Sequence, residues 1–261
     1  MHQKPKKRLG QNFLTDRNIR NKIIAACGLN KNDIVLEIGS GRGELTFEIA
    51  RLVDKVYALE IDSGLCETLK ESLSGYKNIE VINADFLKFD IKKHFSIRNK
   101  KLKVIGNIPY YISSAIIQHL VKNKELVEII FLTVQKEFAK RIIACPGGKD
   151  YGSFSCFVQY HFAPRILFNI KNRSFTPAPK VDSCFLTLAA FGNRGLSKKD
   201  EDLLFKIIRG AFSKRRKTLK NGLKGIIALN KLEDFLNRYK ININIRPEKL
   251  SLDKFIKLAK F

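Results

Sequence analysis

Short apolar runs, rich in β-branched residues, alternate with amphipathic stretches of helical length over residues 33–134. This alternation predicts a parallel sheet with helices on both faces, because strands buried on both sides are apolar throughout and parallel neighbours need a crossover. Ligands of such sheets bind at the carboxyl ends of the strands. The five predicted strands contain Ile34–Leu36, Val56–Leu59, Val81–Ile82, Val104–Ile105 and Ile129–Leu132.

Two further extended runs, Arg165–Ile170 and Val181–Leu188, follow in the second half of the chain. The loop between them contains Pro177 and Pro179 and is too short for a helical crossover, so we expect an antiparallel pair. With the five parallel strands, they predict a seven-stranded, mostly parallel sheet.

Helical periodicity continues to the end of the chain after a glycine-containing link, residues 192–195. The sequence therefore predicts an α/β domain over residues 1–192 and a small all-α domain over residues 193–261.

The charge points to a polyanionic partner. The chain has 49 Lys and Arg against 25 Asp and Glu, a formal net charge of +24. Nucleic acid is favoured over a membrane surface, since no apolar stretch approaches the roughly 20 residues needed to span a bilayer and no signal segment is apparent. We expect a soluble, cytoplasmic monomer. The histidines and the five cysteines lack metal-ligand spacing, so we expect reduced core cysteines and no metal.

Three elements at the predicted carboxyl edge suit a nucleoside cofactor. The segment Glu37-Ile-Gly39-Ser-Gly41-Arg-Gly43 follows the first strand, and its glycines allow close approach of the backbone to a ligand. Glu60 ends the second strand, where a carboxylate accepts from ribose hydroxyls. Nicotinamide and S-adenosylmethionine proteins share these two elements, and a structural glycine turn with solvated acids is a third interpretation. Asp85, placed to accept from an adenine amino group, favours S-adenosylmethionine.

The loop Gly106-Asn107-Ile108-Pro109-Tyr110 after the fourth strand suits methylation of an adenine amine. Pro109 stiffens the loop. The side-chain oxygen of Asn107 and the backbone carbonyl of Pro109 would accept the two N6 hydrogens and favour a pyramidal, nucleophilic nitrogen. Tyr110 would stack on the flipped base. A strand-ending turn with a core tyrosine is the alternative for this segment alone.

Taken together, ordered motifs over essentially the whole chain resemble the ribosomal RNA adenine dimethyltransferase family, its small-subunit branch in particular. The small-subunit likeness depends mainly on residues 213–219 and 246–252. The motifs are Gln11–Leu14, Glu37–Gly41, Asn107–Tyr110, Gln135–Glu137, Tyr151–Ser153, Phe175–Ser183 and Phe212–Leu219.

The resemblance implies a Rossmann-like methyltransferase fold, S-adenosylmethionine as methyl donor, and a donor pocket lined by Asn12, Leu14, Gly39, Glu60, Asp85 and Asn107. Tyr110 and Phe175 would enclose the target adenine. The implied substrate is a pair of adjacent adenosines in the 3′-terminal hairpin loop of small-subunit (16S) ribosomal RNA, within an immature 30S particle, each dimethylated at N6. A role in small-subunit assembly is also implied.

A basic segment supports an RNA partner independently. Residues 206–224 contain eight Lys or Arg and no acid, among them Arg215, Arg216 and Lys217, whereas a solvated helix face usually balances its charges. The competing hypotheses are methylation of large-subunit (23S) RNA, as in antibiotic-resistance enzymes, and a mainly non-catalytic RNA-binding assembly or transcription factor.

Overall fold

The computed structural model describes residues 5–95, 100–192, 194–214 and 217–261. The chain forms two compact units: Met1–Ala139 with Arg165–Ala190, and Lys140–Pro164 with Phe191–Phe261. The sequence pattern does not reveal that residues 140–164 group with the C-terminal helices. The functional division after residue 192 stays a prediction.

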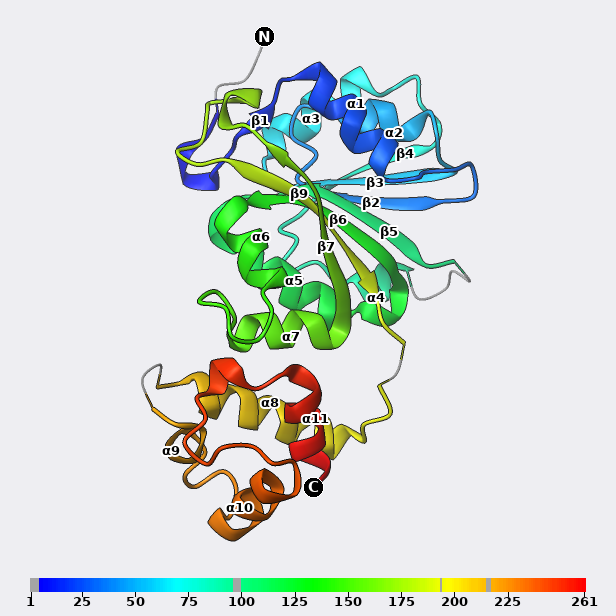
Figure 1. The fold of residues 1–261 in the computed structure, drawn as a ribbon. Helices are drawn as coiled ribbons and strands as arrows, with labels where there is room; N and C mark the ends of the chain where they lie inside the picture. Colours follow the sequence, from blue (N-terminus) through cyan, green and yellow to red (C-terminus); the bar gives the residue numbers. More distant parts are fainter. Residues whose placement is uncertain (1–4, 96–99, 193, 215–216) are drawn as a thin grey trace. The chain divides into compact units, whose positions relative to one another are not determined.

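A seven-stranded sheet, in the order β4-β3-β2-β5-β6-β9-β7, forms the centre of the first unit and confirms the predicted α/β fold (Figure 1). The pairs from β4 to β6 are parallel, and β9 is antiparallel to β6. The two late strands expected from the sequence are neighbours in this sheet. The strands are β2 (Ile34–Ile38), β3 (Lys55–Glu60), β4 (Ile79–Asn83), β5 (Leu102–Asn107), β6 (Val127–Gln135), β7 (Phe162–Ile170) and β9 (Ser183–Ala190).

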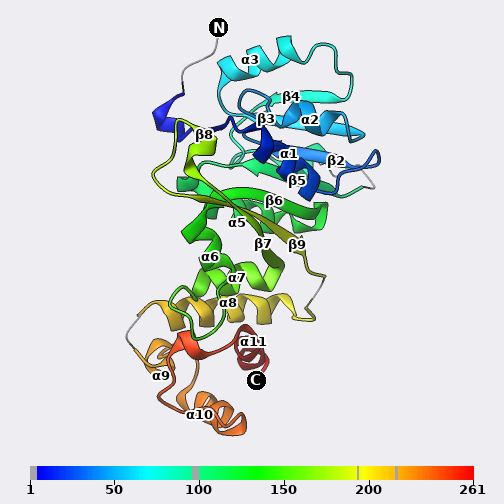
Figure 2. The same cartoon turned by 45° about the horizontal axis from the view of Figure 1, so that its top comes forward.

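Helices cover both faces of the sheet. Helices α1, α2 and α3 lie on one face of the sheet, and α4 and α5 lie on the other, as Figures 1 and 2 show. This division follows from right-handed crossovers, because the chain moves outward from β2 to β4 and then returns across the sheet to β5. The helices are α1 (Arg17–Ala26), α2 (Thr46–Ala50) and α3 (Ser63–Ser72) on the first face, with α4 (Ile91–Phe95) and α5 (Ser113–Lys122) on the second.

A small second sheet was not expected from the sequence. Strand β1 (Phe13–Leu14) pairs antiparallel with β8 (Phe175–Thr176), and Leu14 lies opposite Phe175. Both residues are buried, 3% and 2% exposed, in the core that also contains Phe131 and Phe185. Two-residue strands have no periodicity of their own, so only the folded chain reveals this pairing.

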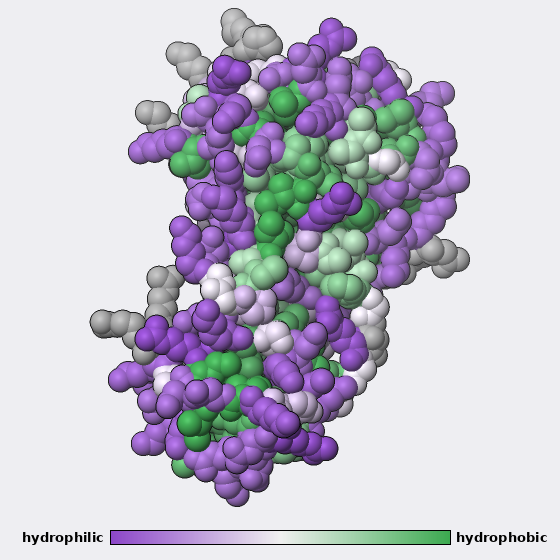
Figure 3. All heavy atoms as spheres, in the orientation of Figure 1, coloured by the Kyte–Doolittle hydropathy of each residue, from purple (hydrophilic) through white to green (hydrophobic). Residues whose placement is uncertain are grey.

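The second unit is helical. Its core contains Leu204, Ile208, Phe235 and Phe255, each no more than 1% exposed. On the face drawn in Figure 3, hydrophilic side chains dominate the outer surface, with apolar areas enclosed among them. The helices are α7 (Ser153–His161), α8 (Lys198–Phe212), α9 (Leu219–Gly222), α10 (Leu229–Arg238) and α11 (Leu252–Lys260), and α6 (Lys136–Ile143) begins in the first unit and ends in the second.

The cysteines are free thiols, and four of them are buried as expected. The expectation was wrong for Cys145, which is exposed because it lies in the loop after α6. Across the described ranges, no helix is long and apolar enough to span a membrane.

Candidate active site

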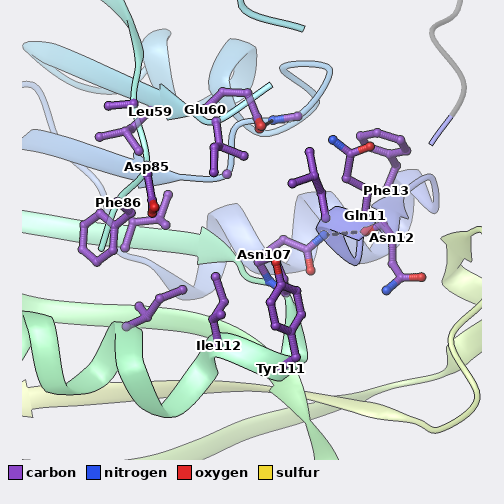
Figure 4. A pocket seen from close by; sticks show the side chains of 18 residues that line it. Gln11, Asn12, Phe13, Leu59, Glu60, Asp85, Phe86, Asn107, Tyr111 and Ile112 are labelled. Atoms are coloured by element: carbon purple, nitrogen blue, oxygen red, sulfur yellow. Dashed lines mark hydrogen bonds between the residues drawn. The ribbon is translucent and has the colours of Figure 1, made fainter. Parts of the chain in front are cut away.

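A pocket opens at the carboxyl edge of the parallel strands in the first unit. Its walls come from the ends of β2, β3 and β5, from the loop after β4, from the start of α5 and from the N-terminal segment, as Figure 4 shows. We call it the donor pocket, after the methyl donor that the sequence resemblance implies. The lining residues are Leu9, Gln11, Asn12, Phe13, Ile38, Gly39, Gly41, Leu59, Glu60, Ile61, Ala84, Asp85, Phe86, Asn107, Pro109, Tyr111, Ile112 and Ile116.

The glycine-rich turn after β2 forms the floor of this pocket. The amide of Gly39 donates to the carbonyl of Leu59 at 2.8 Å, which ties the turn to the end of β3. Gly43 has φ +85°, and a Cβ there would lie 2.7 Å from Leu69 Cδ2. Gly41 has φ +57°, and a Cβ there would press on the Phe13 ring at 3.3 Å. Left-handed backbone and close packing together explain the glycines.

Glu60 is held rigidly at the end of β3. Its two carboxylate oxygens accept from the backbone amides of Gly41 and Asp62, both at 2.9 Å, and the residue is 5% exposed. Burial is the largest influence on the Glu60 carboxyl and raises its pKa, although these hydrogen bonds act against it. Each carboxylate oxygen keeps a second lone pair with which to accept from a ligand hydroxyl.

The N-terminal segment is anchored on Asp62. Lys6 Nζ lies 2.7 Å from Asp62 Oδ1, and Gln11 Nε2 donates to Oδ2 at 3.4 Å. Burial acts to raise the pKa of Asp62, but the hydrogen bonds from Lys6, Gln11 and the Gly64 amide and the charge of Lys6 together outweigh it, so the pKa lies below its usual value. Because Leu9, Gln11 and Phe13 line the donor pocket, this anchor fixes one of its walls.

Asp85 lies in the loop after β4. One oxygen accepts from the amide of Leu87 at 3.0 Å, which orients the carboxylate. Ile61 and Phe86 directly follow Glu60 and Asp85 in the sequence, and both add apolar side chains to the pocket lining. An acceptor beside apolar walls suits a planar base that carries an amino group.

Asn107 presents its side-chain oxygen to the pocket. Its amide nitrogen donates to the backbone oxygen of Asn12 at 2.9 Å, which fixes the carboxamide orientation and leaves the oxygen as the acceptor (Figure 4). The Pro109 carbonyl accepts from Ile112 N and Ser113 Oγ, both at 3.3 Å. Among the described residues, nothing donates to the carbonyl of Ile108, which belongs to the same loop.

Several predicted site residues lie outside the pocket lining. The hydroxyl of Tyr110 hydrogen-bonds with Ser183 Oγ, and burial raises the pKa of this half-buried tyrosine. Leu14 and Phe175 pack in the core. Arg215 and Arg216 lie outside the described residues, and Lys217 is exposed in the second unit.

The structure therefore brings together Asn12, Gly39, Glu60, Asp85, Asn107 and Pro109. Sequence reasoning missed Gln11, Phe13, Ile61, Phe86 and Tyr111 as lining residues, although each of them directly follows or precedes a predicted site residue. Tyr111, 67% exposed, is the aromatic residue of the Asn107 loop that lines the pocket. In the part of the chain that the structure describes, no group of three or more His, Cys, Asp or Glu is arranged to hold a metal ion.

The sheet order, the glycine turn after β2 and the acids after β3 and β4 define a Rossmann-like methyltransferase. Comparison with known proteins gives the family. The family model described as "Ribosomal RNA adenine dimethylase" matches residues 2–261. The chain belongs to the ribosomal RNA adenine dimethylase family.

Two relatives carry the name ribosomal RNA small subunit methyltransferase A. The protein from Caldanaerobacter subterraneus subsp. tengcongensis is 43% identical over 98% of this chain and 96% of its own length. The protein from Fusobacterium nucleatum subsp. nucleatum is 39% identical over 100% of this chain and 98% of its own length.

Solved structures agree with this family. A dimethyladenosine transferase from Plasmodium falciparum superposes with a TM-score of 0.82 and 29% identity, covering 94% of this chain and 95% of its own. The 23S rRNA methyltransferase ErmE superposes with a TM-score of 0.74 and 27% identity, covering 96% of this chain and 100% of its own.

Proposed function

We propose that the protein uses S-adenosylmethionine to dimethylate N6 of two adjacent adenosines in the 3′-terminal hairpin loop of small-subunit (16S) ribosomal RNA. The target is the RNA in an immature 30S particle in the cytoplasm, and the protein acts as a monomer. Relatives named for the small subunit, at 43% and 39% identity, support this choice over 23S RNA, because the 23S enzyme ErmE is 27% identical.

The residues of the donor pocket fit S-adenosylmethionine. The Glu60 carboxylate would accept from the ribose hydroxyls and the Asp85 carboxylate from the adenine amino group, beside the apolar side chains of Ile61 and Phe86. Gly39, with the backbone of Asn12 and Leu14, would allow close approach of the amino acid portion. When bound, this donor supplies an electrophilic methyl group on a sulfonium.

The single observation that carries the proposed activity is the fixed carboxamide of Asn107. Because its nitrogen is engaged by Asn12 O at 2.9 Å, its oxygen is the group that accepts one N6 hydrogen of the target. A backbone carbonyl of the same loop accepts the other. Pro109, the carbonyl expected from the sequence, lines the pocket and already accepts two hydrogen bonds. The carbonyl of Ile108, a residue that is 2% exposed, accepts none from the described residues and is the alternative acceptor. Two acceptors localise the N6 lone pair, which forms the new N–C bond as the C–S bond breaks, and the displaced N6 proton leaves to water.

The target base would stack on aromatic rings, a contact worth roughly 1–3 kcal/mol per base. Tyr110 and Phe175 are the proposed pair. Phe175 is 2% exposed, so contact with a base requires it to become more exposed than it is here. The exposed ring of Tyr111 is available without such a change. Flipping an unpaired loop adenosine costs less than extracting one from a duplex.

The helical C-terminal domain, with Arg215, Arg216 and Lys217, is proposed to bind RNA phosphates. The excess of Lys and Arg over Asp and Glu in the whole chain, 49 against 25, supports a polyanionic partner. The catalytic domain is proposed to comprise residues 1–192 and the RNA-binding domain residues 193–261.

The test is methyl transfer from radiolabelled donor to small subunits and large subunits isolated from a strain without the modification. We expect label in the small-subunit RNA alone, recovered as N6,N6-dimethyladenosine after digestion. Label in large-subunit RNA would favour the 23S alternative, and RNA binding without transfer would favour a non-catalytic assembly factor.

A further inference from the structure

An arginine-rich groove lies on the first unit beside the donor pocket. Its lining includes four arginines and two glutamates from α1, from the glycine turn after β2 and from α2: Arg17, Arg20, Arg42, Arg51, Glu44 and Glu48. We call this surface the arginine groove. None of these six side chains takes part in the transfer chemistry proposed above.

The arginine groove lies at the same edge of the sheet as the donor pocket. Arg17 begins α1, and Arg42 directly follows Gly41 in the turn after β2. The guanidinium carbon of Arg42 lies 4.2 Å from the centre of the Phe13 ring. Phe13 and Gly41 line the donor pocket, so the groove and the pocket share a wall. A chain bound in the groove therefore lies next to the site of methyl transfer.

The groove carries a net positive charge. Glu48 pairs with Arg51 at 3.3 Å, which neutralises one arginine at its margin. In the described part of the chain, no carboxylate forms an ion pair with Arg17 or Arg20. Glu44 is the remaining acid, and Arg20 and Arg42 both act on it electrostatically. The lining thus has four arginines against two glutamates, a formal charge of +2.

The positions of Arg17 and Arg20 are unfavourable for the helix itself. The first turn of α1 contains no acid, and cations near a helix N-terminus oppose the helix dipole. The amides of Asn18 and Ile19 already donate to Asp16 Oδ1, at 3.0 and 3.2 Å, so an anion here would be bound by side chains. Residues that violate a local rule are expected where function requires them.

We propose that the arginine groove binds the sugar–phosphate backbone of the substrate RNA beside the target adenosine. The inference rests on the proposed function, because it requires an RNA substrate. Guanidinium groups bind phosphate oxygens through two parallel hydrogen bonds, which fixes position as well as charge. The arginine groove thereby holds the RNA strand in register while the flipped base contacts the Asn107 loop.

The test is the double variant Arg17→Gln/Arg20→Gln, assayed for methyl transfer to unmodified small subunits across a salt series. Each phosphate contact contributes roughly 0.7–0.9 to the salt slope, so two lost contacts raise the RNA KM on the order of tenfold or more near ~0.1 M salt and flatten the slope by about 1.4–1.8. Donor affinity stays unchanged. The Tm stays equal or rises, since two cations leave the helix N-terminus.

Two matched variants separate position from charge. Lys101→Gln/Lys122→Gln removes two exposed charges that precede β5 and end α5, at the opposite edge of the sheet, and should leave the RNA KM near the parent value. Arg17→Lys/Arg20→Lys should keep most of the salt slope. If the Arg17→Gln/Arg20→Gln variant matched the Lys101→Gln/Lys122→Gln variant in RNA KM and salt slope, the groove proposal would be overturned while the proposed function stood. A parent protein that transferred no methyl to RNA would overturn both.

Discussion

Replacing Glu60 by glutamine tests how the donor pocket recognises its ligand. The carboxylate accepts from the amides of Gly41 and Asp62, one on each oxygen, both at 2.9 Å. A carboxamide has only one oxygen, so one of these two amides loses its acceptor and faces an NH₂ group instead. The substitution also removes the negative charge of the group that would accept hydrogen bonds from the ribose hydroxyls.

A hydrogen bond to a charged group contributes roughly 1.5–3 kcal/mol. Losing one such bond between the Glu60 carboxylate and the ribose should therefore weaken donor binding about tenfold to a hundredfold. Isothermal calorimetry with S-adenosylmethionine and its demethylated product measures this directly. Glu80→Gln is the matched control, because Glu80 is 44% exposed and pairs with Lys55 on the surface of β4. Equal donor affinities for the Glu60→Gln variant, the control and the parent would refute the proposed role of Glu60.

Three further predictions concern neighbouring groups. Asp62→Asn should speed donor dissociation by about tenfold in stopped-flow measurements, because it removes the charge that anchors Lys6; an unchanged rate would show that the anchor does not matter. Asp85→Asn should weaken the binding of S-adenosylmethionine about tenfold but leave the binding of an analogue lacking the adenine amine unchanged. Equal losses of affinity for both ligands would contradict the proposed contact between Asp85 and the adenine amine. Burial raises the pKa of Glu37 from its usual 4.5 to about 8, so the parent should lose stability as pH rises through that window, by roughly 1.4 kcal/mol per pH unit, and Glu37→Gln should lose less. Urea unfolding at several pH values measures the free energy of unfolding of both proteins. Parallel pH profiles for the parent and the Glu37→Gln variant would exclude this role of Glu37.

Much of the fold follows from local patterns in the sequence. Buried parallel strands are mostly apolar: β2 is apolar except for Glu37, and all five of its residues are buried in the structure. The glycine turn, Glu60, Asp85 and Asn107 could be placed at one edge because the carboxyl ends of parallel strands meet there.

The remaining features depend on contacts between distant residues. The pairing of β1 with β8 joins residues 13–14 to residues 175–176, and neither dipeptide has a periodicity that predicts it. The anchor between Lys6 and Asp62 spans 56 positions. The choice of Tyr111 over Tyr110 as the lining residue depends on the turn after Pro109, which directs the Tyr110 hydroxyl to Ser183.

The oxygen of Asn107 is proposed to make the target amine reactive, and one measurement in cells tests this role most directly. Ribosomal RNA from a strain that lacks the gene is compared by primer extension after complementation with the parent gene or with Asn107→Ala. Two methyl groups on N6 remove the Watson–Crick donor, so the parent should give strong stops at the two adjacent adenosines of the small-subunit hairpin loop. The variant, confirmed as folded and bound to donor in vitro, should give read-through there. Equal stops in both strains would contradict the proposed role of Asn107.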